Sequence, residues 1–216
     1  MLAVIDMGMG NLQSVVNAFH RMGAQVTVTT ESHDIESASA VVLPGVGAFG
    51  DGMVSLQRKG LIEPLRRHVE EKKPLFGICL GMQLLAEEGE EHGVHRGLGF
   101  IRGRVVRLKP SDERYRVPNM GWCDVHIARR PTLLFSDLPD GESFYFAHSY
   151  HFQCSDPSDV TATIEYSGRP VTAAIEHGHL FGIQFHPEKS QDAGLQLLQS
   201  FYHYVQKNVP ALRETG

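Results

Sequence analysis

Hydrophobic positions in the first half of the chain alternate between short apolar runs and helical spacing. Leu2–Ile5 form an apolar run, and Leu12, Val15, Val16 and Phe19 follow at the spacing of one helix face. Similar runs predict strands over residues 25–28, 40–43 and 75–78, and a helix over residues 61–71. Strands that alternate with helices favour an α/β fold with a mostly parallel sheet covered on both faces.

The second half has shorter, β-rich segments separated by Pro, Gly and Asp. These segments, over residues 103–108, 143–146, 160–165 and 171–176, predict antiparallel strands appended to the parallel sheet. Residues 176–179 are typical of a hairpin turn that leads into an apolar run over residues 180–185. Ser190 is a candidate N-cap for a final helix whose apolar stripe ends at Val205. We find no linker, so one domain over residues 1–216 is expected.

Composition and charge narrow the classes of function. The net charge of -5 disfavours binding to nucleic acid, which relies on clustered Lys and Arg. No segment has the run of about 20 apolar residues that a membrane span needs, and the amino terminus does not resemble a secretory signal. Three cysteines, Cys79, Cys123 and Cys154, lack paired spacing, which argues against disulfides or a zinc site. We therefore expect a cytoplasmic protein that binds a small molecule or a protein, with neither metal nor cofactor.

The segment Gly77-Ile-Cys-Leu-Gly81 is the strongest chemical signal in the sequence. It follows an apolar strand and has the Gly-x-Cys-x-Gly spacing of a nucleophile elbow, in which a strand turns directly into a helix. A β-carbon two residues either side of the nucleophile would collide with a neighbouring strand or helix. The positive end of the helix dipole would favour the thiolate of Cys79. A buried, inert cysteine is the alternative interpretation of this segment.

Residues His186, Pro187 and Glu188 provide a candidate base and its orienting carboxylate. On an extended backbone the side chains of His186 and Glu188 point to the same side, so the imidazole could take the proton of the cysteine while the carboxylate holds the other N–H. Alone, the pair is more typical of a surface histidine beside a solvated acid, because the chain has 12 histidines. Combined with the elbow it predicts a catalytic triad.

The glycine-rich segment Leu43-Pro-Gly-Val-Gly-Ala-Phe-Gly50 follows a predicted strand. Its backbone N–H groups could bind an anion, yet it lacks the Lys-Ser/Thr ending of a phosphate-binding loop. In an acyl-transfer enzyme such a loop could supply a donor to an oxyanion. The alternative is an ordinary turn between a strand and a helix.

Together these segments resemble the triad, or class I, glutamine amidotransferases over nearly the whole chain. Residues 77–83 and 184–190 match the general family, whereas residues 6–11, 44–47, 118–122 and 144–150 resemble its histidine-biosynthesis branch. The resemblance implies a three-layer α/β/α, flavodoxin-like fold. One departure is Cys123, which stands where that branch usually has Asn.

The resemblance also implies the roles of individual residues. Cys79 would attack the side-chain amide of glutamine, His186 would act as base and then as acid, and Glu188 would orient His186. The oxyanion would be held by N–H groups of Leu80 and of the loop at Val46 and Gly47. Glutamine would be held by Gly47, Gln83, Glu91, Ser149 and Tyr150. Glu91 belongs to an acidic run, residues 87–91, that a solvated helix end would explain equally well.

A partner is implied as well: a cyclase with a (β/α)8 barrel that receives the ammonia and makes imidazole glycerol phosphate. These 216 residues include no barrel, so we expect the cyclase to be a separate chain in a heterodimer. The interface would include Asn11, Met120, Trp122, Tyr145 and Lys189. His148 and His151 are expected to pack or form hydrogen bonds rather than bind metal.

Two other functions stay open from the sequence. A stand-alone hydrolase of the same fold, such as a γ-glutamyl hydrolase, would be fully active without a partner. A catalytically silent regulatory module would keep the fold, although the triad argues against it.

Overall fold

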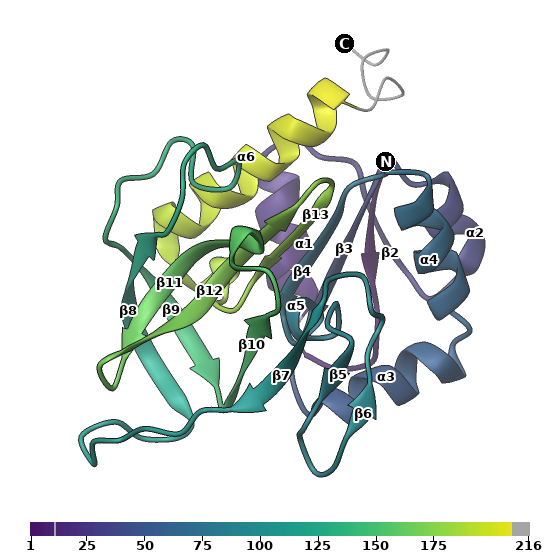
Figure 1. The fold of residues 1–216 in the computed structure, drawn as a ribbon. Coiled ribbons are helices and arrows are strands. Elements are labelled where there is room, and N and C mark those ends of the chain that lie inside the picture. Colours follow the sequence, from purple (N-terminus) through teal and green to yellow (C-terminus); the bar gives the residue numbers. More distant parts are fainter. Residues whose placement is uncertain (11, 209–216) are drawn as a thin grey trace.

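The parallel part of the main sheet lies at the centre of the fold (Figure 1). The computed structural model describes residues 1–10 and 12–208. Within that part of the chain, the main sheet has the strand order β2-β1-β3-β4-β13-β12-β11-β8-β9. The five strands from β2 to β13 in this order are parallel to one another. They are β1 (Leu2–Ile5), β2 (Val26–Thr29), β3 (Ala40–Gly45), β4 (Leu75–Cys79) and β13 (Leu180–Ile183).

Antiparallel strands extend the same sheet beyond β13. These are β12 (Arg169–His177), β11 (Val160–Tyr166), β8 (Asn119–Ile127) and β9 (Glu142–His148). A smaller sheet in the described residues has the order β10-β7-β5-β6. Its strands are β10 (Tyr150–Cys154), β7 (Gly103–Arg107), β5 (Glu88–Gly89) and β6 (His95–Arg96).

Helices cover both faces of the parallel strands. On β1, Leu2 and Val4 face the core formed with α1 (Leu12–Arg21) and α6 (Gln191–Asn208). Ala3 and Ile5 face the other core. That side is covered by α2 (Ser32–Ser37), α3 (Phe49–Arg58), α4 (Ile62–Glu70) and α5 (Leu80–Gln83). Because successive side chains of a strand point to opposite faces of the sheet, both faces are apolar and both are covered by helices. The result is the expected three-layer α/β/α arrangement.

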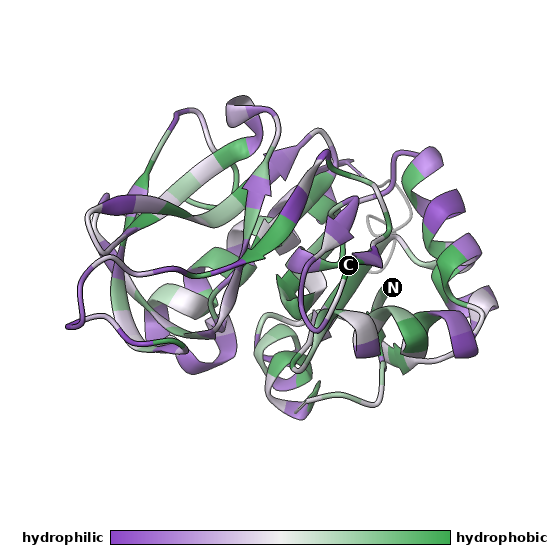
Figure 2. Ribbon diagram, turned by 60° about the horizontal axis from the view of Figure 1, so that its bottom comes forward, coloured by the Kyte–Doolittle hydropathy of each residue, from purple (hydrophilic) through white to green (hydrophobic). Residues whose placement is uncertain are grey.

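Hydropathy along the ribbon agrees with these layers. Figure 2 shows hydrophobic colours over the strands of the sheet and hydrophilic colours on outer helix turns and loops. The cluster Phe76, Phe181 and Phe201 joins β4, β13 and α6 through rings whose centroids are 4.7 and 5.6 Å from that of Phe201. No helix in the described ranges is long and apolar enough to cross a membrane.

The carboxyl-terminal segment differs in two respects from the sequence prediction. Strand β13 ends at Ile183, so the segment from Gln184 to the short turn at Pro187–Lys189 is buried but not part of the sheet. Helix α6 does begin directly after Ser190. The Ser190 hydroxyl, however, donates to the carbonyl of His186 at 2.6 Å and accepts from the N–H of Tyr145 at 3.0 Å. Its bonds therefore fix the segment around His186. Another short turn, Pro157–Asp159, precedes β11.

Candidate active site

Cys79 lies at a sharp turn between β4 and α5. Its backbone has φ 53° and ψ -109°, a conformation that is strained for a residue with a side chain. A β-carbon on Gly77 would lie 2.6 Å from the backbone of Gly81, and one on Gly81 would lie 1.6 Å from the carbonyl oxygen of Leu43. Both glycines are thus required by close backbone packing, as the sequence predicts. The elbow places Cys79 at the start of a helix, 6% exposed.

His186 and Glu188 meet through a different local geometry from the one predicted. The backbone between them is a 3₁₀ turn over Pro187–Lys189 rather than extended chain, so the alternation argument was wrong. Pro187 fixes φ at the first position of this turn, where its missing N–H costs no hydrogen bond. The turn still brings Nδ1 of His186 to 2.9 Å from Oε1 of Glu188, with both side chains buried.

The electrostatics favour a charged imidazole at His186. Burial by itself lowers its pKa, but hydrogen bonds and charge interactions with Cys79 and Glu188 outweigh burial and raise the pKa to about 10. Cys79 and Glu188 therefore flank an imidazolium at neutral pH. An imidazolium beside the cysteine can donate a proton to a leaving group.

A cavity of about 360 Å³ opens beside Cys79. Its volume is within the range of small-molecule sites. Residues from five separate parts of the chain line it: Val46, Gly47, Ala48, Cys79, Leu80, Gln83, Glu91, Pro118, Met120, Ala147, His148, Ser149 and Tyr150. Every residue predicted to hold glutamine or the oxyanion is therefore at this cavity.

Glu91 does not belong to a helix end. Helix α5 ends at Gln83, and the acidic run continues through the short strand β5 into a turn. The Glu91 carboxylate reaches across to α3, where Oε2 accepts the N–H of Phe49 at 2.9 Å. A carboxylate at a helix N-terminus is favourable, and this contact holds Glu91 at the cavity wall. The solvated-helix alternative is therefore wrong for this acid.

His148 is a cavity residue to which the sequence assigned only packing or hydrogen bonding. Its Nδ1 donates to the carbonyl of Tyr150 at 2.9 Å, so Nε2 accepts from Nδ2 of Asn119 at 3.1 Å. Burial lowers the pKa of His148 to about 4, with a smaller effect from the positive charge of His186. A neutral His148 therefore adds no charge to the wall of the cavity. His148 lies within residues 144–150, which resemble the family, but no rule of residue spacing predicts that its side chain lines the cavity.

Cys123 and Cys154 are poor nucleophiles. Burial raises the pKa of the Cys123 thiol, and burial together with nearby carboxylates raises that of Cys154 to about 12. The thiol, rather than the reactive thiolate, is favoured at both positions.

Three of the predicted interface residues, Trp122, Tyr145 and Lys189, lie together, and a fourth, Met120, lines the cavity. Trp122 on β8 pairs directly with Tyr145 on β9, and their ring centroids are 6.2 Å apart. Nζ of Lys189 lies 5.7 Å from the centroid of the Tyr145 ring. Met120 and Trp122 are 65% and 50% exposed, which is unusual for large apolar side chains. Asn11, the fifth predicted residue, lies outside the described residues.

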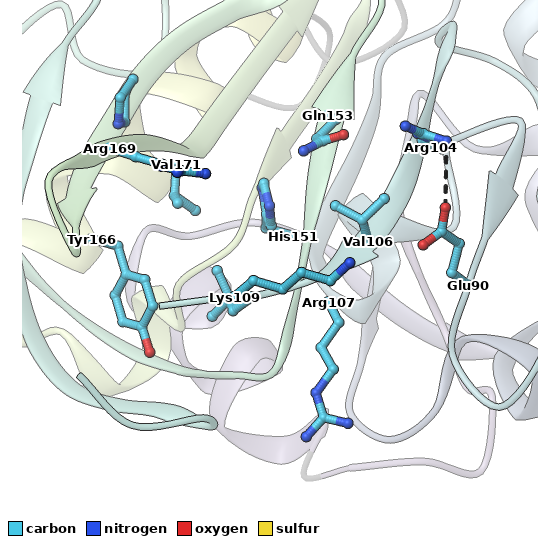
Figure 3. Close-up of a pocket in the computed structure, with 12 residues that line it drawn as sticks. Glu90, Arg104, Val106, Arg107, Lys109, His151, Gln153, Tyr166, Arg169 and Val171 are labelled. Atoms are coloured by element: carbon cyan, nitrogen blue, oxygen red, sulfur yellow. Dashed lines mark ion pairs between the residues drawn. The ribbon is translucent and has the colours of Figure 1, made fainter. Parts of the chain in front are cut away.

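A second cavity, of about 450 Å³, lies over β7, β10 and the turn between β11 and β12. Figure 3 shows His151 at its centre, with Lys109, Arg107 and Arg169 around it. The dashed line marks the ion pair of Arg104 with Glu90, 3.5 Å apart. The residues described in its lining include no cysteine.

The fold and the turn at Cys79 are those expected of a glutamine amidotransferase. Residues 3–205 match the family described as glutamine amidotransferase class-I. The chain belongs to this family. Among solved structures, PurLQS from Thermotoga maritima superposes with a TM-score of 0.74 at 19% identity, covering 95% of this chain and 98% of that one. A structure described as a glutamine amidotransferase gives 0.72 at 19% identity, covering 94% and 98%. Both confirm the fold.

Relatives of higher identity carry a more specific name. A protein of Syntrophotalea carbinolica named imidazole glycerol phosphate synthase subunit HisH is 47% identical over 205 residues, which cover 93% of this chain and 98% of that protein. Proteins with the same name from Moorella thermoacetica and Sulfurimonas denitrificans are 47% and 44% identical, each covering 94% of this chain and 95% and 98% of their own lengths.

Proposed function

We propose that the chain hydrolyses glutamine to glutamate and ammonia as the glutaminase subunit of imidazole glycerol phosphate synthase in histidine biosynthesis. The observation that carries this function is the placement of His186 between Cys79 and Glu188, with Nδ1 2.9 Å from Oε1 of Glu188, beside a cavity of about 360 Å³. The HisH relatives, similar over nearly their full length, support the pathway.

The chemistry proceeds through a thioester. The Cys79 thiolate attacks the side-chain carbonyl carbon of glutamine, and the C–N bond breaks as His186 donates its proton to the departing ammonia. The resulting neutral His186 then takes a proton from water, which attacks the thioester and releases glutamate. As the C–S bond breaks, the thiolate leaves and the proton stays on His186, so the starting thiolate and imidazolium are restored, while the new carboxylic acid of glutamate loses its proton to solvent. Glu188 stabilises the imidazolium whenever it forms.

The oxyanion of both tetrahedral intermediates needs donors beside Cys79. We assign this role to the N–H of Leu80, the first residue of α5, and to the loop at Val46 and Gly47. Gly47 has φ +110°, which glycine adopts without strain.

Glutamine itself would occupy the cavity with its ammonium facing Glu91. Gly47, Gln83, Ser149 and Tyr150, which also line this cavity, would hold the remaining polar groups. The placement is supported by charge, since Glu91 is the carboxylate of the cavity lining.

The partner in this proposal is a separate cyclase that receives the ammonia in a heterodimer. The exposed Met120 and Trp122, with Tyr145 and Lys189, form an aromatic and cationic surface close to the cavity mouth. Aromatic and methionine side chains are enriched in protein interfaces. We also propose that the protein is cytoplasmic, does not bind nucleic acid, and forms one domain, which is supported by a main sheet that takes strands from both halves of the chain.

A glutaminase assay of the purified chain, with and without the cyclase and its nucleotide ligand, tests this function. We expect turnover of glutamine to rise at least tenfold when both are added. Equal turnover without the cyclase would favour a stand-alone hydrolase. No turnover in either condition, with Cys79 unlabelled by a glutamine-like electrophile, would favour a silent regulatory module.

A further inference from the structure

Gln184 lies beside the nucleophile, and neither the triad nor the glutamine contacts above give it a role. It follows β13 directly, and its side chain is fully buried. Its backbone N–H donates to the carbonyl of Ala173 at 2.8 Å, so the residue is held by the neighbouring strand. A buried side-chain amide needs partners for both its oxygen and its nitrogen.

The partners of Gln184 fix the orientation of its amide. Nε2 of Gln83 donates to the carbonyl of Tyr150 at 3.0 Å and to Oε1 of Gln184 at 3.0 Å. Both hydrogens of the Gln83 amide nitrogen are therefore used on oxygen acceptors. Because the oxygen of Gln184 faces Gln83, its Nε2 faces the opposite way, where it donates to Sγ of Cys79 at 3.7 Å.

We propose that Gln184 is a positioning residue of the glutaminase reaction, which donates a hydrogen bond to the Cys79 thiolate and holds Sγ at the glutamine cavity. Gln83, which lines that cavity, keeps the amide of Gln184 in the donating orientation. Hydrogen bonds to an ionised acceptor are stronger than neutral ones. The bond therefore stabilises the thiolate more than the thiol.

This role is distinct from that of His186. The imidazolium contributes a charge and a transferable proton, whereas an amide N–H contributes a fixed donor that stays in place when the proton has moved to ammonia. Gln184 thus continues to hold the sulfur after His186 becomes neutral. The inference rests on the proposed function only for the identity of the substrate, since the contact with Cys79 belongs to the free chain.

The test measures the reactivity of Cys79 against pH in the full-length chain. Iodoacetamide labels the protein at a series of pH values, and mass spectrometry of the Cys79 peptide gives the rate. We expect Gln184→Leu to move the midpoint of this profile about one unit towards alkaline pH, which is a tenfold loss of reactivity at pH values below the midpoint. Gln184→Glu keeps the size and the acceptor but loses the donor, so we expect at least the same displacement.

Activity of the complex with the cyclase provides a second measurement. We expect Gln184→Leu to lower kcat for glutamine about tenfold while KM changes less than threefold, because Gln184 contacts the nucleophile and not the substrate. Gln83→Leu should raise KM and also lower kcat, because Gln83 lines the cavity and orients the amide of Gln184. Thr161→Val is the matched control, since Thr161 is fully buried and polar but lies on β11. It should leave both the labelling profile and kcat unchanged.

Thermal melting identifies variants that fold. A folded Gln184→Leu or Gln184→Glu with the wild-type labelling midpoint would overturn the proposal, as would an equal displacement in Thr161→Val. If the wild-type complex fails to hydrolyse glutamine, the proposed function fails, while the labelling profile still decides the role of Gln184.

Discussion

The Nδ1 atom of His186 lies 2.9 Å from Oε1 of Glu188, and this contact, together with that of Cys79, favours the charged imidazole. Both side chains are buried, and the second oxygen of Glu188 has no partner in the described residues. The carboxylate therefore has one principal contact, with the imidazole. Loss of its charge should act on catalysis through His186.

Glu188→Gln is expected to lower kcat for glutamine about 10²- to 10⁴-fold, because the amide can neither stabilise the imidazolium nor fix its tautomer. Steady-state kinetics of the complex measure this, with KM for glutamine expected to change little. The control is Glu165→Gln, an exposed acid on β11. A fall in kcat of less than threefold for Glu188→Gln would contradict the assignment.

Glu91→Gln should raise KM for glutamine about 10- to 100-fold, since a hydrogen bond between charged groups contributes about 1.5–3 kcal/mol. Its neighbour Glu90 provides the control, because that side chain pairs with Arg104 at the second cavity. Initial rates at a series of glutamine concentrations separate the two acids. Equal effects of Glu90→Gln and Glu91→Gln would place the ammonium of glutamine elsewhere.

Trp122→Ala should weaken binding of the cyclase by about 2 kcal/mol, or roughly thirtyfold in Kd, if this half-exposed ring is an interface anchor. Val94 is also exposed and apolar, at 72%, but lies next to β6. Val94→Ala should leave the affinity unchanged. Titration calorimetry of the two subunits measures both, and wild-type affinity in Trp122→Ala would exclude this surface as the interface.

The lowered pKa of His148 predicts how the free energy of unfolding depends on pH. Burial lowers its pKa from 6.5 to about 4, so between these values the unfolded chain binds more protons than the folded one. The free energy of unfolding should therefore fall as the pH decreases from 6.5 towards 4, by about 3 kcal/mol for this residue. His151, whose pKa burial also lowers to about 4, acts in the same direction.

Urea unfolding at several pH values measures this slope. We expect His148→Gln to flatten it between pH 6.5 and 4, whereas His203→Gln, on the exposed face of α6, should leave it unchanged. An unaltered slope in His148→Gln would show that this imidazole is not the group responsible.

The sequence was most informative where covalent geometry restricts the chain. Gly77 and Gly81 could be interpreted in advance because only glycine permits the backbone contacts of the elbow. Strands β1 to β4 and helices α1 and α4 followed from the hydrophobic period, whereas helices α2 and α3 were not predicted. Strand β8 was not predicted, because its residues alternate between half-buried and exposed and include Gly121.

Contacts between distant segments could not be predicted. The hydrogen bond between Phe49 and Glu91 joins residues 42 positions apart in the sequence. The bonds of Gln184 with Gln83 and with Cys79 join residues 101 and 105 positions apart. No local pattern reports such pairings, since they depend on the order of strands in the sheet. Pro187 illustrates a subtler limit: its position was recognised, but the 3₁₀ turn that it begins was not.

Cys79→Ala in the complex with the cyclase tests the central claim most directly, by comparing synthesis of imidazole glycerol phosphate from glutamine and from added ammonium salts. The account predicts that synthesis from glutamine is abolished while synthesis from ammonium is retained, because Cys79 serves only to release ammonia. Loss of both activities, or retention of glutamine-dependent synthesis, would contradict it.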